Sequence, residues 1–210
     1  LKFEDPIEVA RTLCRRIMGQ RGPVRIVDCG DVPGDVTDVH ASFDRARATV
    51  AQIVDRGAVP VVIGGTDSIP IAVARGFQNH GPIVVIQVDE HLDFKDNWRG
   101  IREGYSSPMR RISEMAWVSD IFQIGLHSMG SALVSDVEEA LAAGHTLITE
   151  RQVHDRGMQW VLDQIPDGAS YLITIDYDGF DVTCCPAVSH PEPGGLSYHE
   201  GVALLEGLAA

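Results

Sequence analysis

The stretch "IVVIQVDEHLDF" at residues 83–94 joins an apolar run to a group of polar side chains. Residues 83–88 have the length and β-branched content of a buried strand. Their nearly continuous hydrophobicity is typical of a parallel strand that is covered on both faces. The polar residues that follow are Asp89, Glu90, His91 and Asp93. Burying such groups costs free energy unless something compensates them, so this stretch bears on both fold and function.

Similar apolar runs recur along the chain and alternate with amphipathic stretches. The further predicted strands are "VRIVD" (24–28), "AVPVVI" (58–63), "IFQIGL" (121–126) and "YLITI" (171–175). Apolar residues at helical spacing predict helices over 42–57, 131–144 and 150–165, the last interrupted by Gly157. This alternation predicts a three-layer α/β/α fold with a mostly parallel central sheet, formed by one domain over residues 1–210.

Composition limits the classes of partner. The chain has a formal net charge of −13 and a pI near 4.9. This charge argues against a nucleic-acid surface and is compatible with cationic ligands or metal ions, while an acidic surface that only maintains solubility explains it equally well. No apolar run is long enough to span a membrane, and no signal segment opens the chain. The four cysteines lack paired metal or disulfide spacing, so we expect free thiols and a cytoplasmic protein.

Acidic residues follow three of the predicted strands. In open α/β sheets, ligands bind outside the carboxyl ends of the strands. The glycine turn "GGTDS" (64–68) contains Asp67, which could cap the following helix or bind a ligand. Asp89, His91 and Asp93 share one side of an extended segment, and Asp176 and Asp178 share one side of another. Unpaired carboxylates at one site would repel, whereas divalent cations would neutralise them, so a two-metal site explains both clusters better than solvated strand ends.

Six motifs in order resemble those of the ureohydrolases, the family of arginase and agmatinase. "VDEHLD" (88–93) is similar to the family's D-A-H-x-D signature, and "ITIDYDGFD" (173–181) to its S-x-D-x-D-x-x-D-P signature. The other similar motifs are "IGGTDSI" (63–69), "YSSPMRR" (105–111), "QIGLHS" (123–128) and "PAVSHPEPGGLSYHE" (186–200). The agmatinase-like branch is the most similar, and the resemblance covers roughly residues 24 to 208.

The resemblance implies an arginase-like fold and a binuclear centre, usually manganese. Asp89 and Asp176 would bridge the ions and act in catalysis, Asp93 would complete one side, and His91 with Asp178 would hold the other. Glu90 stands where the family has a small residue and is not expected to be a ligand. Substrate contacts are expected from two residues of the last motif, Glu192 and His190, and Asp181 is expected to order a loop.

Two departures from the family pattern affect the expected chemistry. Asp67 stands where the family has a histidine ligand. A carboxylate there still suits manganese, but its extra negative charge should weaken the ions as Lewis acids. Tyr105 stands where the family's catalytic loop has a histidine, and a phenol is a poorer proton shuttle near neutrality. His127, His190 and His199 are alternative shuttles.

The resemblance implies hydrolysis of a guanidino C–N bond with release of urea. The expected substrate is a small cationic guanidino compound, such as agmatine or a guanidino acid, and the expected assembly is a homo-oligomer, trimeric or hexameric. We expect no nucleic-acid or membrane partner. The chain lacks the family's early G-x-R-x-G-P segment and its E-V-N-P strand, so we expect a domain without those parts. The alternative function is a catalytically weak family member that serves as a metal-binding or regulatory subunit.

Overall fold

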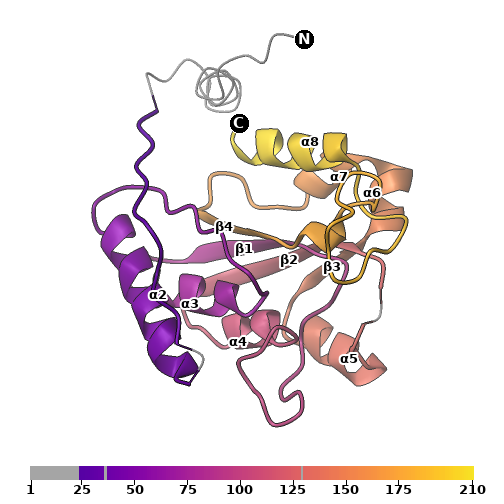
Figure 1. Ribbon diagram of the computed structural model, residues 1–210. Helices are drawn as coiled ribbons and strands as arrows, with labels where there is room; N and C mark the ends of the chain where they lie inside the picture. Colours follow the sequence, from indigo (N-terminus) through magenta and orange to yellow (C-terminus); the bar gives the residue numbers. More distant parts are fainter. Residues whose placement is uncertain (1–23, 36, 129) are drawn as a thin grey trace.

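The central feature is a parallel sheet of the strand order β3-β2-β1-β4 (Figure 1). The computed structural model describes residues 24–35, 37–128 and 130–210. The strands are β1 (Ile83–Val88), β2 (Val118–Leu126), β3 (Thr146–Thr149) and β4 (Tyr171–Ile175). Each neighbouring pair is parallel. All four carboxyl ends therefore lie at one edge of the sheet, where parallel α/β proteins bind ligands.

Helices cover both faces of this sheet, which confirms the expected three-layer fold (Figure 1). One face carries α2 (Val39–Val54), α3 (Ile69–Arg75), α4 (Pro108–Ser113) and α5 (Val134–Ala142). The other face carries α6 (Glu150–Arg156), α7 (Met158–Leu162) and α8 (Tyr198–Leu208). A short 3-10 turn, η1 (Tyr177–Gly179), follows β4.

Side chains of β1 alternate between two apolar cores. Val85 packs in the core with Ile71 of α3 and Met109 of α4. Ile86 packs in the opposite core with Val153 of α6 and Leu204 of α8. This alternation follows from the two-residue period of a strand, and it explains why β1 is buried at every position.

Local sequence signals account for several helix boundaries. The Asp38 side chain accepts a hydrogen bond from the Ala41 N–H and caps α2. At the start of α8, Ser197 and Glu200 form a capping box. Gly157 has φ +82° and separates α6 from α7, as the interrupted pattern over 150–165 predicted.

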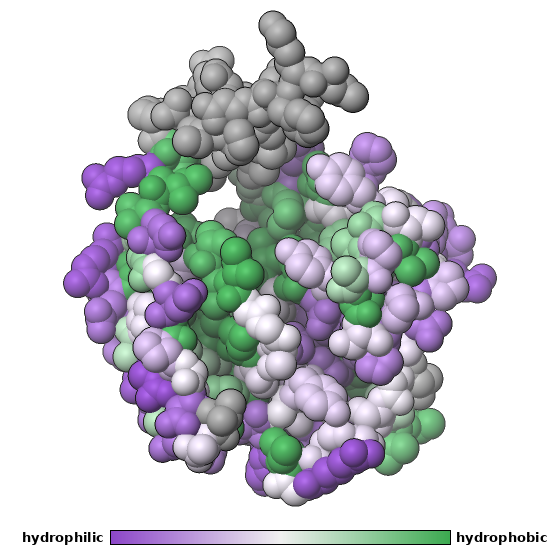
Figure 2. Space-filling model, in the orientation of Figure 1, coloured by the Kyte–Doolittle hydropathy of each residue, from purple (hydrophilic) through white to green (hydrophobic). Residues whose placement is uncertain are grey.

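Two of the predicted strands are wrong. Residues 24–28 and 58–63 have no strand assignment, and they expose large apolar side chains, with Ile26 74% and Ile63 94% exposed. In Figure 2, apolar side chains gather at the surface on the upper left of the view, near the segment before α2. Their composition suits a pleated, half-buried surface, but a strand also needs a hydrogen-bonded neighbour. In the described residues β4 is one of the two edge strands and pairs only with β1.

The remaining elements show where the sequence signal was weak. The four-residue β3, the six-residue α4 and α8 were not predicted. Cys29, Cys184 and Cys185 are free thiols, as expected, whereas Cys14 lies outside the described residues. Within the described part of the chain, no helix has the length and apolar character needed to cross a membrane.

Candidate metal centre

The parallel pairing of β1 with β4 brings the two acidic clusters together. Val88 and Ile175, the last residues of these strands, are register partners, so Asp89 and Asp176 follow side by side. The Asp176 N–H donates to the carbonyl of Val88 at 2.9 Å, and the Asp89 N–H donates to the carbonyl of Ile124 at 3.2 Å. Both aspartates are thus anchored by the backbone where the sheet ends.

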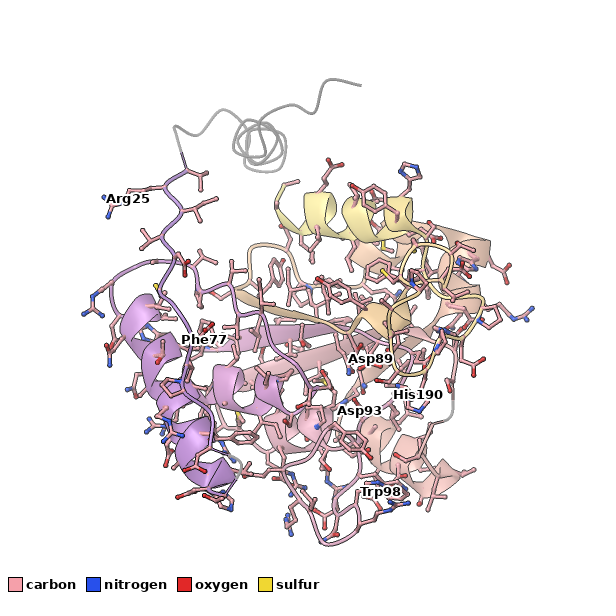
Figure 3. All side chains as sticks on the ribbon, in the orientation of Figure 1. Arg25, Phe77, Asp89, Asp93, Trp98 and His190 are labelled. Carbon is pink, nitrogen blue, oxygen red and sulfur yellow. The ribbon has the colours of Figure 1, made fainter. Side chains whose placement is uncertain are left out.

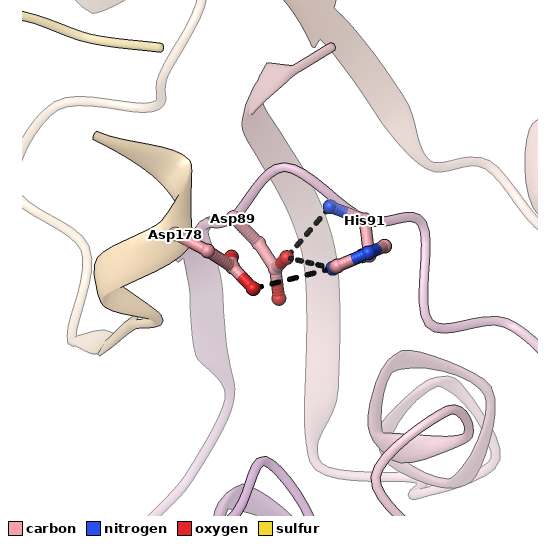
Figure 4. Close-up of side chains that lie close together, drawn as sticks. All are labelled: Asp89, His91 and Asp178. Atoms are coloured by element: carbon pink, nitrogen blue, oxygen red, sulfur yellow. Dashed lines mark hydrogen bonds and ion pairs between the residues drawn. The ribbon is translucent and has the colours of Figure 1, made fainter. Parts of the chain in front are cut away.

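Asp89, His91 and Asp178 form the first potential cation site (Figure 4). His91 Nδ1 lies 3.5 Å from Asp89 Oδ1 and 3.4 Å from Asp178 Oδ2. The three ligand atoms of this group lie within 4.8 Å of one another. A single ion could therefore contact an imidazole and two carboxylates here.

Asp67, Asp89 and Asp93 form the second potential site, again with ligand atoms within 4.8 Å of one another. Asp67 precedes α3, whose N-cap is Ser68, and Ser68 makes no side-chain capping bond. Asp93 has φ +49°, a left-handed conformation that aspartate tolerates better than most residues. The turn before α3 and the loop after β1 thus both contribute to the site, with Asp89 shared between the two groups.

In the second group, Asp67 and Asp93 form no ion pair with any described residue. Burial, with the nearby Asp89 charge, raises the pKa of Asp67 and of Asp93 well above the ordinary value. Burial also raises the pKa of Asp89 to about 7. Burial and the Asp178 charge raise the pKa of Asp176. These groups are held in an environment that disfavours their ionised forms unless a cation is present.

His91 changes the balance in the first group. Although burial works against both ionised forms, hydrogen bonding between His91 and Asp178 lowers the pKa of Asp178 and raises the pKa of His91 to about 10. The imidazole therefore acts as the counter-ion of this group, and a metal ion would have to displace its proton.

The donor set fits hard divalent cations. Carboxylate oxygens and one imidazole suit manganese-like ions, whereas a site for soft ions would contain thiolates. Asp67 Oδ2 is buried and has no hydrogen-bond partner among the described residues, which is the kind of orphaned oxygen that a cation would satisfy. The two adjacent groups could hold a pair of ions.

A glycine is required where η1 crosses the end of β1. A Cβ atom on Gly179 would lie 2.7 Å from the backbone nitrogen of Asp89 and 2.8 Å from its Cα. Only a residue without a side chain lets Asp178 approach Asp89 this closely. The "DYDGFD" spacing therefore has a steric reason as well as a chemical one.

The sequence did not predict the surroundings of the Glu90 side chain. Its side chain is fully buried, and neither carboxylate oxygen has a hydrogen-bond partner in the described part of the chain. The oxygens lie 3.1 Å from His91 Nε2 and 3.5 Å from His127 Nε2. Burial raises the pKa of Glu90 to about 7. Glu90 thus lies behind the cluster, between two imidazoles, and on the far side of His91 from the candidate ions.

The other predicted site residues lie at different distances from the cluster. The His190 ring packs edge-on against His91, with centroids 5.9 Å apart, and Figure 3 shows His190 beside Asp89 and Asp93. The Glu192 charge contributes to the raised pKa of Glu90, after burial and the Asp178 charge, so Glu192 lies in the same region. Tyr105 is 59% exposed in the loop before α4. Its role as a proton shuttle stays a prediction.

The structure also describes the surroundings of the alternative proton shuttles, His127 and His199, and of the expected loop residue, Asp181. His127 contacts Glu90 from the end of β2, whereas His199 packs against Tyr198 on α8. Asp181 accepts hydrogen bonds from the backbone N–H groups of Thr183 and Gly194, and it orders this loop as expected.

The fold and the site define an α/β protein with a carboxylate-rich candidate cation centre at the carboxyl edge of a parallel sheet. The profile of the Arginase family matches residues 8–210. The chain therefore belongs to the Arginase family, which confirms the resemblance of its motifs to ureohydrolases.

Known relatives agree with this assignment. The chain is 28% identical over 203 residues to "Arginase 1, mitochondrial" of Arabidopsis thaliana, covering 90% of this chain and 57% of the relative. It is 31% identical over 164 residues to the N(1)-aminopropylagmatine ureohydrolase of Synechocystis sp., covering 73% and 49%. The crystal structure of agmatine ureohydrolase of Thermoplasma volcanium superposes with a TM-score of 0.71 at 26% identity, covering 81% and 57%. The chain thus spans about half the length of these relatives.

Proposed function

We propose that this protein is a metal-dependent ureohydrolase that cleaves a guanidino C–N bond and releases urea. The observation that carries the proposal is the position of Asp89, which belongs to both potential cation groups at the edge of the sheet. The proposed ligands of two divalent ions, manganese by family membership, are Asp67, Asp89, His91, Asp93, Asp176 and Asp178.

The reaction that such a site supports is hydrolysis of a planar guanidinium. The oxygen of a water molecule adds to the guanidinium carbon, the C–N bond to the amine breaks, and the departing nitrogen takes a proton. The products are urea and an amine. Bound divalent ions would acidify that water and neutralise the surrounding carboxylates.

The chain's own residues would bind and orient the substrate. The acidic cluster attracts a cation, and Glu192 adds negative charge near it. His190 is proposed to contact a bound substrate, and its exposure and its edge-on packing against His91 support this role. Tyr105 is proposed to deliver the proton to the leaving nitrogen from the loop before α4. The relatives are named for arginine or agmatine-type substrates, which share a guanidinium group, so we propose this chemical class and a homo-oligomeric enzyme.

A second candidate function is a catalytically weak, metal-binding subunit. The observation that favours it is the exposure of Tyr105, 59%, at the position where the family's loop carries a histidine. In this alternative the cation groups stabilise the fold or an assembly, and turnover is lost.

Urea release separates these two functions. The protein is loaded with manganese and assayed against arginine, agmatine and guanidino acids, and bound metal is measured on the same sample. We expect urea from one compound and none from the Asp89→Asn variant. Bound metal without urea from any compound would support the second candidate, and a protein that retains no metal would contradict both.

A further inference from the structure

A chain of buried polar side chains leads from the interior of the sheet to Asp89. Gln87 of β1 and Gln123 of β2 are register partners on neighbouring strands, and both are 0% exposed. They project into the core that also contains Val85 and Ile121. Burying a primary amide is costly unless its donors and acceptor are used, so this pair requires an explanation.

In this series of buried side chains, every hydrogen bond is donated in the direction of Asp89. His145 Nδ1 lies 2.9 Å from Gln123 Oε1. The Gln123 amide donates to Gln87 Oε1 at 2.6 Å, and the Gln87 amide donates to Asp89 Oδ2 at 2.7 Å. Each donor thus points toward the candidate metal centre, and the last acceptor is the carboxylate shared by both cation groups.

A backbone carbonyl fixes this direction. The Gln123 NH₂ group also donates to the Leu92 carbonyl at 2.7 Å. Because a carbonyl only accepts, the NH₂ group of Gln123 must face Leu92, and its oxygen must face His145. The second N–H of Gln123 then requires the oxygen of Gln87, which leaves only the Gln87 NH₂ group for Asp89.

Both carboxylate oxygens of Asp89 accept hydrogen bonds from other groups of the protein. Oδ1 accepts the His91 N–H at 2.6 Å, and Oδ2 accepts the Gln87 amide. Two donors from different positions define the rotation of the carboxylate about its χ angles. The remaining lone pairs can then face the two cation groups at once, which a freely rotating carboxylate would not maintain.

We propose that Gln87 is a positioning residue for Asp89 and that Gln123, oriented by the Leu92 carbonyl, fixes the direction of the Gln87 amide. This inference rests on the proposed function, because it assigns Asp89 to a metal centre. Hydrogen-bond partners of metal ligands contribute about 10- to 100-fold in metal affinity. Loss of the Gln87 amide should therefore weaken metal binding without removing any ligand.

The test compares Gln87→Met with Ile86→Met in the 210-residue chain. Methionine in place of Gln87 keeps the volume and removes the donor to Asp89, whereas Ile86 faces the opposite core and makes no polar contact with the site. Manganese affinity is measured by calorimetry, and cobalt(II) is used as a probe because its visible absorption reports ligand geometry. Circular dichroism verifies that each variant is folded.

We expect Gln87→Met to lose about 10- to 100-fold in manganese affinity and to change the cobalt spectrum. Ile86→Met should retain both properties. If Gln87→Met does not fold, Gln87→Asn replaces it, because asparagine keeps the amide but is one methylene too short to reach both partners. Unchanged affinity and spectrum in the Gln87 variant would overturn the positioning role alone. Absence of metal binding in the unaltered chain would overturn the proposed function, and the positioning role with it.

Discussion

The end of β1 and the segment 24–28 have the same sequence pattern but different environments. Both are short β-branched runs that end in aspartate, Asp89 in one and Asp28 in the other. β1 has strands on both sides and a helical layer on each face, whereas 24–28 has no paired neighbour in the described residues. An apolar run therefore indicates where a strand can form, and its neighbours decide whether its terminal acid is forced into a site.

The largest expected difference between the two regions is in metal binding. Asp176→Asn removes a proposed ligand at the end of β4, and we expect manganese affinity to fall by about 100-fold or more. Asp28→Asn makes the same change after an exposed run, where, among the described residues, the aspartate accepts a hydrogen bond from the Gly30 N–H alone. Calorimetric titration of both variants checks this contrast. Equal losses in the two variants would contradict the proposed site.

The second expected difference between the two regions is in their contribution to the free energy of unfolding. Ile86 is fully buried, and Ile86→Ala should lower the free energy of unfolding by about 2–5 kcal/mol. Ile63, which is 94% exposed, should tolerate the same change to within about 0.5 kcal/mol. Urea denaturation of both variants measures these differences. A large loss in Ile63→Ala would show that residues 58–63 are buried in the protein in solution.

The packed region should also show a pH dependence that involves His145. Burial lowers the pKa of His145 from 6.5 to about 4, and its Nε2 is buried with no hydrogen-bond partner among the described residues. Below pH 6.5 the unfolded chain therefore binds a proton that the folded protein resists. The contribution of His145 to the free energy of unfolding is therefore at its full value above pH 6.5. It decreases by about 3 kcal/mol in total as the pH falls from 6.5 toward 4.

The His145→Asn variant isolates this contribution from the other titrating groups. The free energy of unfolding is measured for both proteins between pH 7 and pH 4, and the difference between them is plotted. We expect the difference in free energy of unfolding between the unaltered protein and the variant to decrease as the pH falls. A difference that is constant with pH would show that His145 accepts a proton as readily in the folded protein as in the unfolded chain.

The smallest expected effect concerns association. Contiguous exposed apolar side chains promote contacts between molecules, and Val61 lies within the exposed run 58–63. Val61→Lys should reduce concentration-dependent light scattering while leaving the free energy of unfolding unchanged to within about 0.5 kcal/mol. The same substitution at Ala58, at the start of the run, serves as a control for added charge alone.

The sequence predicted the elements whose signal is local and repeated. β1, the core of β2, β4 and the helix α2 followed from β-branched content and helical spacing, and the acids after β1 and β4 followed from the strand-end rule. β3 was missed because "TLIT" is only four residues long and is followed directly by the helix α6. Residues 24–28 and 58–63 were misassigned because pairing depends on a neighbour that composition does not reveal.

Within the site, the motifs indicated the candidate ligands, but not the groups behind them. The hydrogen bonds of Gln87 and Gln123 depend on strand register, which the sequence leaves open. The burial of Glu90 between His91 and His127 depends on the loop after β2, where backbone N–H groups of residues 127 and 128 bind the Glu90 carbonyl. Long-range contacts of this kind are determined by tertiary structure alone.

The close approach of η1 to the end of β1 has a consequence for the order of folding. Glu90 and Asp178 are joined by a hydrogen bond across 88 positions of the chain, and Gly179 permits this contact. The complete candidate ion site therefore cannot exist on the ribosome until β4 has emerged and docked beside β1. A cation that binds only then acts as a late ligand of the finished domain, and it shifts the equilibrium toward the folded state in proportion to its free concentration.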